Sequence, residues 1–264
     1  MKVGFIGCGN MASAMIGGII RNQVVAPQDI LASAKTEASR ERAAKNLGIR
    51  LTASNKEVAS FADVLILAIK PFYYQEVIAQ IQEDVKEDTV IVSITPGKTL
   101  EWLEEQFGRP MKIVRTMPNT PALVGEGISC ICPGPGATQE DTDKVCEIFS
   151  GFGKTELVTE PMIDVFVGVS GSSPAYVFMF IEALADAGVS EGMPRAQAYR
   201  FAAQAVLGSA KMVLETGKHP GELKDMVCSP KGTTIEAVRI LEEKGLRSAV
   251  FEAAKACIIK AREV

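Results

Sequence analysis

The pattern that most constrains this chain is an alternation of short apolar runs with helical segments, which continues from residue 2 to about residue 160. Six runs rich in β-branched residues are typical of strands: KVGFIG, DILASA, ADVLILAIK, TVIVSIT, MKIVRT and GISCICP. Helical periodicity is found in residues 10–21, 37–47, 73–83, 99–107 and 138–150. This alternation predicts an α/β domain in which helices cover a parallel sheet.

Beyond about residue 160 the strand-like runs stop, and helical patterns continue to the C-terminus. The sequence therefore predicts two domains, an α/β domain over residues 1–160 and an all-helical domain over residues 161–264. The first helix of the second domain, SPAYVFMFIEALADAGV, is apolar almost all round. A helical domain of about 100 residues does not easily cover such a surface, so we expect a homodimer built on these helices. The alternative is that this helix packs into a groove of the first domain.

Composition excludes several classes of function. The chain has 47% hydrophobic residues, enough for a sizeable core, and a formal net charge of -4 that gives no basic field for nucleic acid. Its six cysteines form no C-x-x-C pair, so neither a zinc site nor a disulfide framework is expected. The single histidine, His219, lies in the turn-like segment TGKHPGEL. Mechanisms that need a Ser-His or Cys-His pair, or several histidine ligands, are disfavoured.

The N-terminus does not have the pattern of a targeting segment. The apolar run in MKVGFIGCGN is too short for a signal peptide. No uninterrupted run of about 18 apolar residues, the length needed to cross a bilayer, follows it. We therefore expect a cytoplasmic protein with no membrane partner.

A glycine motif follows the first predicted strand. In VGFIGCGNMASAM, Gly7, Gly9 and Ala12 form a G-x-G-x-x-A pattern between the strand and a helix. Gly7 permits a tight turn, Gly9 allows the backbone to approach a pyrophosphate, and Ala12 lets the helix lie close to the strand. The position of the motif in a β/α alternation predicts a Rossmann dinucleotide-binding domain.

The end of the second predicted strand indicates which dinucleotide is bound. An NAD site places Asp or Glu roughly 20 residues further on, to hold the ribose hydroxyls. This chain instead has Ser33, Lys35 and Thr36, and a hydroxyl and an ammonium suit a 2′-phosphate. NADP is therefore favoured, although Glu37 is close enough to leave NAD open. Lys35 would otherwise be a solvated residue at a helix start.

Two further segments end predicted strands at the edge where α/β sheets bind ligands. ILAIKPFYY ends in Lys70-Pro71, and IVRTMPNTPALVGEG ends in a proline-rich loop. In that loop Asn119 and Thr120 offer an amide and a hydroxyl to a nicotinamide or a ribose. Such loops are also common as plain connections.

In the helical half, SPKGTTIEAV opens an amphipathic helix near Thr233 or Thr234. Backbone N–H groups of Lys231, Gly232, Thr233 and Thr234 have no upstream helical partner and can converge on an anion. With the dinucleotide phosphates placed on the first helix, that anion would be a substrate carboxylate. Ordinary helix capping by Ser229 or Thr233 is the alternative.

Together these segments resemble pyrroline-5-carboxylate reductases. The similarity is carried by GFIGCGNMASAMIGG, ILAIKP, RTMPNTPALVGEG, GSSPAYVFMFIEALADAGVSEGMPR, HPGELKDMVCSPKGTTIEAV and GLRSAVFEAA. They occur in order and at family spacing from residue 1 to about residue 260. Other Rossmann enzymes share the first motif, but RTMPNTP and SPKGTT are characteristic of this family.

The resemblance implies reduction of the C=N bond of 1-pyrroline-5-carboxylate to L-proline by NADPH or NADH, the final step of proline biosynthesis. It implies a domain-swapped homodimer, often within a larger homo-oligomer, whose helical domains complete each other's active sites. The implied cofactor-binding residues are Gly7, Gly9, Asn10, Met11, Ser33, Lys35, Asn55, Ala68, Lys70 and Pro71. The implied substrate-binding residues are Lys231, Gly232, Thr233 and Thr234, with the Thr234 hydroxyl facing the ring nitrogen as the catalytic group.

The chain departs from the family pattern at two positions. The family commonly reads Gly-Ser-Gly-Pro-Ala where this chain has Ser173 in the place of the second glycine. It commonly reads Ser-Pro-Gly-Gly where this chain has Lys231. The second change adds a cation beside the expected carboxylate.

Three other interpretations are open from the sequence. A β-hydroxyacid dehydrogenase would offer a catalytic lysine in SSPAYVFMFIEALADAGV, which has none. A non-catalytic NADP-binding regulator would not need the Thr234 hydroxyl beside an anion site. A ketol-acid reductoisomerase would need an acidic metal-binding cluster, of which Glu182 and Asp186 supply only one pair. We therefore expect no metal.

Overall fold

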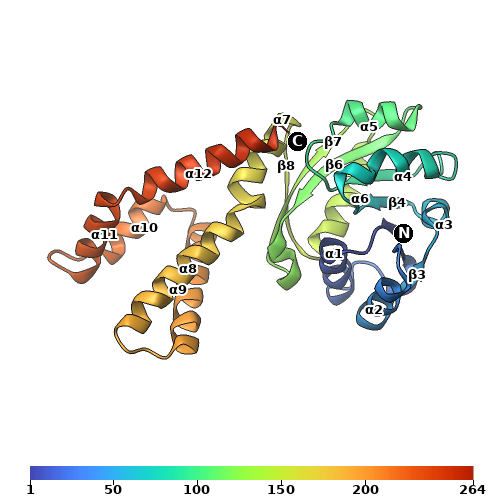
Figure 1. Cartoon of the computed structure of the whole chain (residues 1–264). Coiled ribbons are helices and arrows are strands. Elements are labelled where there is room, and N and C mark those ends of the chain that lie inside the picture. The colour runs from blue at the N-terminus through green and yellow to red at the C-terminus, as the bar shows by residue number, and fades with distance from the viewer. Residues whose placement is uncertain (264) are drawn as a thin grey trace. The chain divides into compact units, whose positions relative to one another are not determined.

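The computed structural model describes residues 1–263, and these fall into two compact units. The first contains Met1–Ser172 and the C-terminal residues from Cys257 onward, and the second contains Ser173–Ala256. Figure 1 shows the first unit as a sheet between helices and the second as helices alone.

Within the described residues the first unit holds one eight-stranded sheet with the order β3-β2-β1-β4-β5-β6-β7-β8. The strands are β1 (Val3–Ile6), β2 (Ile30–Ser33), β3 (Arg50–Thr52), β4 (Val64–Leu67), β5 (Val90–Ser93), β6 (Lys112–Pro118), β7 (Gly127–Pro133) and β8 (Gly153–Leu157). All neighbours are parallel except β6 and β7. The direction of strand order reverses between β1 and β4, which creates a crevice at their carboxyl ends.

Helices cover both faces of this sheet. They are α1 (Asn10–Arg21), α2 (Glu37–Leu47), α3 (Asn55–Phe61), α4 (Tyr74–Ile81), α5 (Leu100–Phe107), α6 (Gln139–Ser150) and α7 (Pro161–Phe166), with short turns η1 (Pro27–Asp29), η2 (Pro71–Tyr73), η3 (Thr120–Val124) and η4 (Val167–Gly171). Strand residues alternate between two cores, since Ile66 packs with Met15 of α1 and Leu67 packs with Ile78 of α4. These residues are fully buried, as expected for strands covered on both faces. The α/β prediction for this half is confirmed.

Two strands and two helices escape the sequence pattern. The strand β3 has only three residues, all exposed or half-buried, and β8 is the polar edge strand GKTEL, so neither has an apolar run. The helices α3 and α7 have only seven and six residues, too few to show a clear helical periodicity. The sheet is parallel, as predicted, except at one pair, because β6 and β7 are antiparallel. Residues 119–126 join them without the long crossover that a parallel connection needs.

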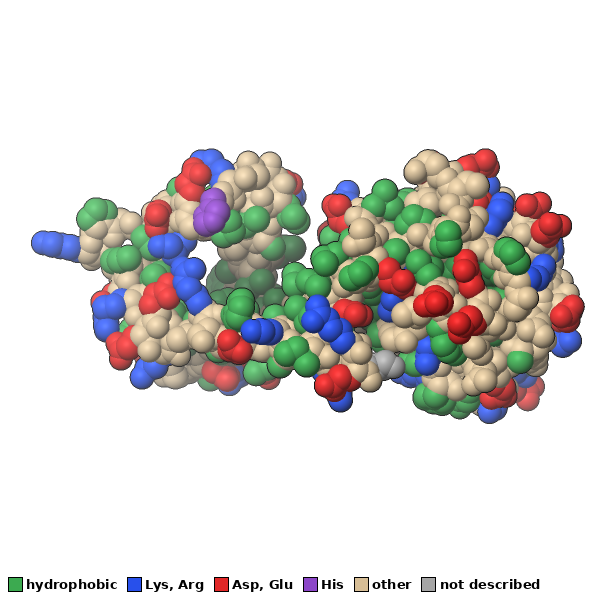
Figure 2. Space-filling model, turned by 90° about the horizontal axis from the view of Figure 1, so that it is seen from above, with side chains coloured by type: hydrophobic (Ala, Val, Ile, Leu, Met, Phe, Trp, Pro, Cys, Tyr) green, Lys and Arg blue, Asp and Glu red, His purple; other side chains and the backbone are tan. Residues whose placement is uncertain are grey.

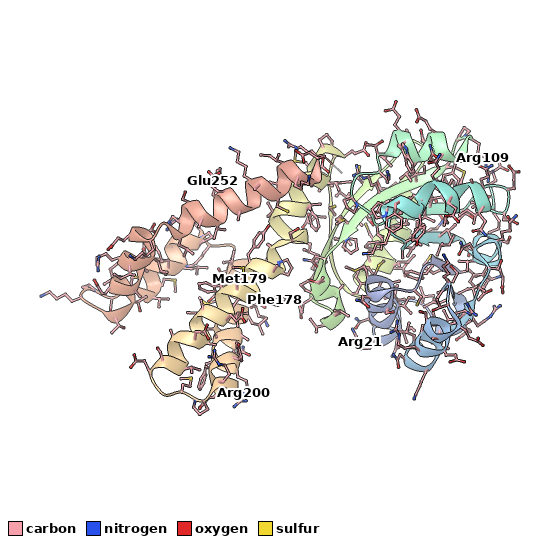
Figure 3. The ribbon with its side chains drawn as sticks, in the orientation of Figure 1. Arg21, Arg109, Phe178, Met179, Arg200 and Glu252 are labelled. Atoms are coloured by element: carbon pink, nitrogen blue, oxygen red, sulfur yellow. The ribbon has the colours of Figure 1, made fainter. Side chains whose placement is uncertain are left out.

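The second unit is helical, and no strand follows Leu157 in the described residues. Its helices are α8 (Ser173–Ser190), α9 (Arg195–Thr216), α10 (Pro220–Val227), α11 (Thr233–Glu243) and α12 (Leu246–Ala261), whose last turns belong to the first unit. Large apolar side chains lie at the surface of these helices (Figures 2 and 3). Phe178, Met179 and Phe251 are each more than 60% exposed. His219 is exposed, as expected, and its Nδ1 accepts the Gly221 N–H at 3.0 Å.

The segment from α7 to α8, Pro161–Ser190, is a long and strongly apolar helical stretch. Over Pro161–Ser190 its best window has a mean hydropathy of 1.3, and 11% of that window is buried. By length and composition alone this one segment of the described chain could cross a membrane. An exposed apolar helix of this kind needs either lipid or protein to cover it.

Two adjacent glycines in α1 give a test of its packing. A Cβ added at Gly18 would lie 2.6 Å from Phe152 Cβ and 2.7 Å from the Gly151 carbonyl oxygen, so Gly18→Ala forces α1 away from the chain after α6. At Gly17 the nearest atom, Leu47 Cδ2, is 3.8 Å away. We predict that Gly18→Ala lowers the free energy of unfolding by about 1–3 kcal/mol.

Gly17→Ala is the matched control and should raise that free energy by about 0.5–1 kcal/mol, because alanine favours the helix. Urea unfolding followed by circular dichroism measures both. Equal effects of the two substitutions would contradict this packing of α1.

Candidate dinucleotide and substrate sites

The turn between β1 and α1 passes directly over the end of β4. Gly7 has φ 93°, and a Cβ there would lie 2.6 Å from the Ala68 carbonyl oxygen. The Ala68 N–H in turn donates to the Ile6 carbonyl at 2.9 Å. Gly7 therefore needs both its backbone conformation and its missing side chain, as the motif predicts.

The N-terminus of α1 opens onto free space. Gly9 is the N-cap residue, and a Cβ built there would have no atom within 4 Å. The first intrahelical bond runs from Ser13 N–H to the Gly9 carbonyl at 2.9 Å, so the N–H groups of Asn10, Met11 and Ala12 lie upstream of it. Uncovered donors and a positive helix end suit a pyrophosphate. The residues present therefore fit a dinucleotide.

Two cavities meet at Gly9, and we call them the adenosine cavity and the nicotinamide cavity. The adenosine cavity, of about 450 Å³, contains five of the residues predicted for the cofactor: Gly7, Gly9, Ser33, Lys35 and Asn55. Thr36, noted in the sequence beside Lys35, also lines this cavity, whereas sequence reasoning did not identify the lining residues Ser39, Arg42, Tyr73, Glu76 and Gln80. The spacing of Thr36, Ser39 and Arg42, three residues apart, is the signal that could have identified their common face.

A chain of hydrogen bonds holds the floor of the adenosine cavity. The Gly7 N–H donates to Ser33 Oγ at 3.3 Å, and the Ser33 hydroxyl donates to Asn55 Oδ1 at 2.7 Å. Asn55 Nδ2 then donates to Gln80 Oε1 at 2.8 Å. Ser33 is 3% exposed, so its hydroxyl orients the glycine loop and Asn55 from below. The order of these residues in the chain gives no hint of this connection.

In the loop between β2 and α2, hydrogen bonds hold the backbone in place while the charged side chain of Lys35 remains exposed. Arg40 Nη1 donates to the carbonyls of Ala34 at 2.8 Å and Lys35 at 3.3 Å. Lys35 is exposed, and its Nζ lies 5.9 Å from the ring centroid of Tyr73. Glu37, which left NAD open in the sequence, does not line this cavity and lies in the first turn of α2.

The nicotinamide cavity, of about 580 Å³, lies on the other side of Gly9. It contains four predicted residues besides Gly9, namely Asn10, Met11, Ala68 and Lys70, together with Thr120 and Leu123. Pro71 begins the turn η2 and lines neither cavity.

Asn119 does not offer its amide to a ligand as the sequence suggested. It is 6% exposed, its Oδ1 accepts the Ile128 N–H at 3.0 Å, and its Nδ2 donates to Ser170. These bonds hold the loop between β6 and β7 and the turn η4. The Thr120 hydroxyl beside it remains in the cavity lining.

Buried polar groups near the cavities are structural. Burial raises the pKa of the Cys8 thiol, against weaker lowering by Ser13 and Arg42, so Cys8 is a neutral thiol at neutral pH. Burial also raises the pKa of the Tyr74 hydroxyl, which donates to the Leu67 carbonyl at 2.7 Å. Tyr74 thereby fixes the end of β4 just before Ala68.

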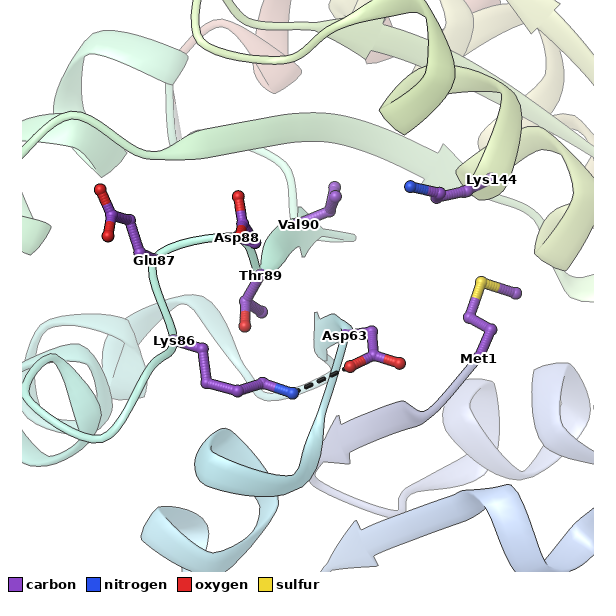
Figure 4. Close-up of a pocket in the computed structure, with 8 residues that line it drawn as sticks. All are labelled: Met1, Asp63, Lys86, Glu87, Asp88, Thr89, Val90 and Lys144. Carbon is purple, nitrogen blue, oxygen red and sulfur yellow. Dashed lines mark hydrogen bonds and ion pairs between the residues drawn. The ribbon is translucent and has the colours of Figure 1, made fainter.

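A third cavity, of about 490 Å³, lies at the opposite, amino ends of β4 and β5 (Figure 4). Burial acts to raise the pKa of Asp63, but bonds from Lys86 Nζ at 2.9 Å and the Lys2 N–H at 2.8 Å outweigh it and lower the pKa. Lys144, also in the lining, pairs with Glu140 at 2.7 Å. Asp63, Lys86 and Lys144 therefore have partners within the protein, and we do not take this cavity as the candidate ligand site.

In the second unit, the predicted anion site begins α11. Gly232 is its N-cap residue and no side chain caps the helix, so capping by Ser229 or Thr233 is not what the structure shows. The N–H groups of Thr233 and Thr234 are free of intrahelical partners. The prediction that Gly232 also offers its N–H is wrong, because that group donates to the Ser229 carbonyl at 3.0 Å.

Lys231 occupies the strained position of this turn. Its φ is 60°, Pro230 precedes it, and the Gly232 N–H donates to the Ser229 carbonyl. Lys231 is therefore the third residue of a type II turn formed by residues 229–232. Glycine favours this position, and the family commonly has it there. The added lysine therefore carries a backbone cost of about 1–2 kcal/mol.

We predict that Lys231→Gly raises the free energy of unfolding by about 0.5–1 kcal/mol. The substitution relieves the backbone strain, but part of this gain is lost because glycine makes the unfolded chain more flexible. Lys231→Ala, the control, keeps Cβ and should give no gain. Urea unfolding compares the two. A similar gain from both would place the cost in the ammonium group rather than in the backbone.

Acidic residues of α8 do not gather into a metal site. Asp186 pairs with Arg195, and no group of three or more His, Cys, Asp or Glu side chains with metal-binding geometry occurs in residues 1–263. The residues present do not fit the acidic cluster that a ketol-acid reductoisomerase would need.

Comparison with known proteins extends the resemblance over the whole chain. Residues 160–264 match the family model for pyrroline-5-carboxylate reductase dimerisation, and residues 2–97 match that for NADP oxidoreductase, coenzyme F420-dependent. The chain is 54% identical to pyrroline-5-carboxylate reductase of Escherichia coli, over all of this chain and 98% of the relative. It is 40% identical to that of Arabidopsis thaliana, over 100% and 95%.

Solved structures agree with this result. A pyrroline-5-carboxylate reductase from Coxiella burnetii superposes with a TM-score of 0.92 at 31% identity, over 99% of this chain and 97% of that one. A Plasmodium falciparum pyrroline carboxylate reductase with NADP bound gives 0.90 at 32% identity, over 100% and 97%. The glycine turn at the β1 and β4 crevice, the helical second unit and the full-length similarity together place the chain in the pyrroline-5-carboxylate reductase family.

Proposed function

We propose that this protein reduces the C=N bond of 1-pyrroline-5-carboxylate to L-proline with NADPH, the final step of proline biosynthesis. The observation that carries this function is the 54% identity to a pyrroline-5-carboxylate reductase over the full chain. The family also accounts for the NADP-type cofactor, and NADH is the alternative reductant.

The first unit supplies the cofactor site. The bound dinucleotide supplies a hydride. The N–H groups at the start of α1 suit its pyrophosphate, and Ser33 and Lys35 suit its 2′-phosphate end, with Asn55 at the adenosine. For the nicotinamide side we propose Asn10, Met11, Ala68 and Lys70, which line the nicotinamide cavity. Pro71, which follows Lys70 at the start of η2, is proposed with them but does not line the cavity.

The second unit supplies the substrate site. We assign the substrate carboxylate to the start of α11, where the N–H groups of Thr233 and Thr234 and the ammonium of Lys231 are available. Gly232 is the N-cap residue of α11, and its N–H is not available to the substrate because it donates to the Ser229 carbonyl. Thr234 is half-buried, and its hydroxyl is the group proposed to face the ring nitrogen.

Protonation of the imine nitrogen makes the ring carbon a better hydride acceptor, so the protein must hold the ring and partner its nitrogen. Positioning of the reacting carbons supplies much of the rate. A threonine hydroxyl orients the ring by hydrogen bonding, but it is too weak an acid to be the source of the proton. The proton therefore comes from solvent or arrives on the substrate.

Assembly follows from the same family. We propose residues 1–160 as the NADP-binding domain and residues 161–264 as the dimerisation and substrate-binding domain of a homodimer or larger homo-oligomer. The family model for dimerisation includes the apolar helix over residues 161–190, so we assign that surface to protein rather than lipid. We further propose a cytoplasmic enzyme without nucleic-acid or membrane partners, in keeping with its net charge of -4.

The alternatives lose support at particular residues. No lysine occurs in α8, where a β-hydroxyacid dehydrogenase would carry its catalytic lysine. A non-catalytic regulator would not need free N–H groups beside a hydroxyl at the start of α11. The ketol-acid reductoisomerase structure that resembles this chain is 13% identical, which is a likeness of fold alone.

The direct test is NADPH oxidation by the purified protein with 1-pyrroline-5-carboxylate, with NADH run beside it. We expect rapid oxidation that depends on both protein and substrate, with one proline formed for each NADPH consumed. A folded protein that binds NADPH but turns over with neither cofactor would exclude this reaction.

We predict that Thr234→Val lowers turnover by about tenfold to a hundredfold, since a hydrogen bond to a charged group is worth about 1.5–3 kcal/mol. NADPH affinity should be nearly unchanged. Thr234→Ser, which keeps the hydroxyl, is the control and should retain most turnover. Equal turnover of the valine variant and the parent enzyme would remove Thr234 from the reaction.

A further inference from the structure

Arg42 is a free cation on the wall of the adenosine cavity. It lies on α2, is exposed, and lines the cavity together with Lys35. Its guanidinium makes no hydrogen bond or ion pair with any of the described residues. Arg40, two positions earlier, is bound to the carbonyls of Ala34 and Lys35. One arginine of α2 therefore holds the loop, and the other is available to a ligand.

The helix directs Arg42 to the same face as two hydroxyl residues. Thr36, Ser39 and Arg42 are spaced three apart, and all three line the adenosine cavity. Thr36 is the N-cap residue of α2: its side chain accepts the Ser39 N–H at 3.3 Å and donates to Ser39 Oγ at 2.8 Å. This arrangement fixes the first turn of the helix and with it the direction from which Arg42 approaches.

The cavity has two walls of different character. The wall from β2 and α2 carries the cations Lys35 and Arg42 and no carboxylate. The wall from η2 and α4 carries Tyr73, Gln80 and Glu76, the one carboxylate in the lining. A dianionic group is therefore favoured against α2, and an uncharged aromatic base is favoured against α4.

We propose that Arg42 is a second cationic residue for the 2′-phosphate of NADPH, acting together with Lys35 and setting the preference for NADPH over NADH. This inference rests on the proposed cofactor. The pyrophosphate already has the N–H groups of α1, whereas the ribose 2′ position is expected at the end of β2, beside Lys35, Thr36 and the face that carries Arg42. A guanidinium binds two phosphate oxygens at once, which a lysine does not.

The test is equilibrium binding of NADPH and NADH to Arg42→Gln, followed by calorimetry or by nucleotide fluorescence without substrate. We expect NADPH to bind about tenfold more weakly or worse, because a charge-assisted bond is lost. NADH should change by less than about twofold. Competition by 2′,5′-ADP should weaken in the same proportion as NADPH, and competition by ADP should not.

Lys45→Gln is the matched control, since Lys45 is an exposed cation on the same helix that does not line the cavity. It should leave both affinities unchanged. Thermal unfolding checks that each variant is folded, and Arg42→Lys, which keeps the charge but loses the forked geometry, should fall between the parent and Arg42→Gln.

Two results would overturn the inference. Equal weakening of NADPH and NADH would assign Arg42 to the pyrophosphate, and unchanged affinity for both would leave it outside the site. In either case tight NADPH binding by the parent protein would leave the proposed cofactor intact. Failure of the parent protein to bind NADPH would overturn both the cofactor and the role of Arg42.

Discussion

The first unit depends on the close crossing of the β1–α1 turn over the end of β4. Gly7 lies so near the Ala68 carbonyl that no side chain fits. Two residues later Gly9 is the N-cap residue of α1, with open space beside it. The same crossing separates the adenosine cavity from the nicotinamide cavity. One steric constraint thereby fixes where the phosphates, the base and the reactive ring of a dinucleotide would lie.

Sequence pattern was sufficient where a single local requirement decides the structure. The buried strand VLIL, the glycine turn and the helices after residue 160 each follow from local periodicity or from a backbone conformation. The same holds for the start of α11, which the SPKGTT segment placed within one residue. Motif position and the family resemblance predicted the candidate cofactor residues, nine of which line the two cavities.

What pattern did not provide depends on contacts between distant segments. β8 is too polar to be recognised alone and forms as a strand because it pairs with β7. Asn119 is drawn from the expected site by bonds to Ile128 and Ser170. The Gly232 N–H is taken up by a turn that exists only because Lys231 adopts a positive φ. The three-residue spacing puts Arg42 on the helix face of Thr36 and Ser39, but only the folded chain shows that this face lines a cavity together with Gly7 and Gly9.

In the proposed reaction a hydride passes from the nicotinamide to the imine carbon of the substrate. The most direct measurement uses NADPH deuterated at the transferring position of nicotinamide C4, with 1-pyrroline-5-carboxylate and mass spectrometry of the product. We expect proline that carries one deuterium, on the ring carbon that is bonded to nitrogen and does not bear the carboxylate. Proline without deuterium, or no proline at all, would contradict this reaction.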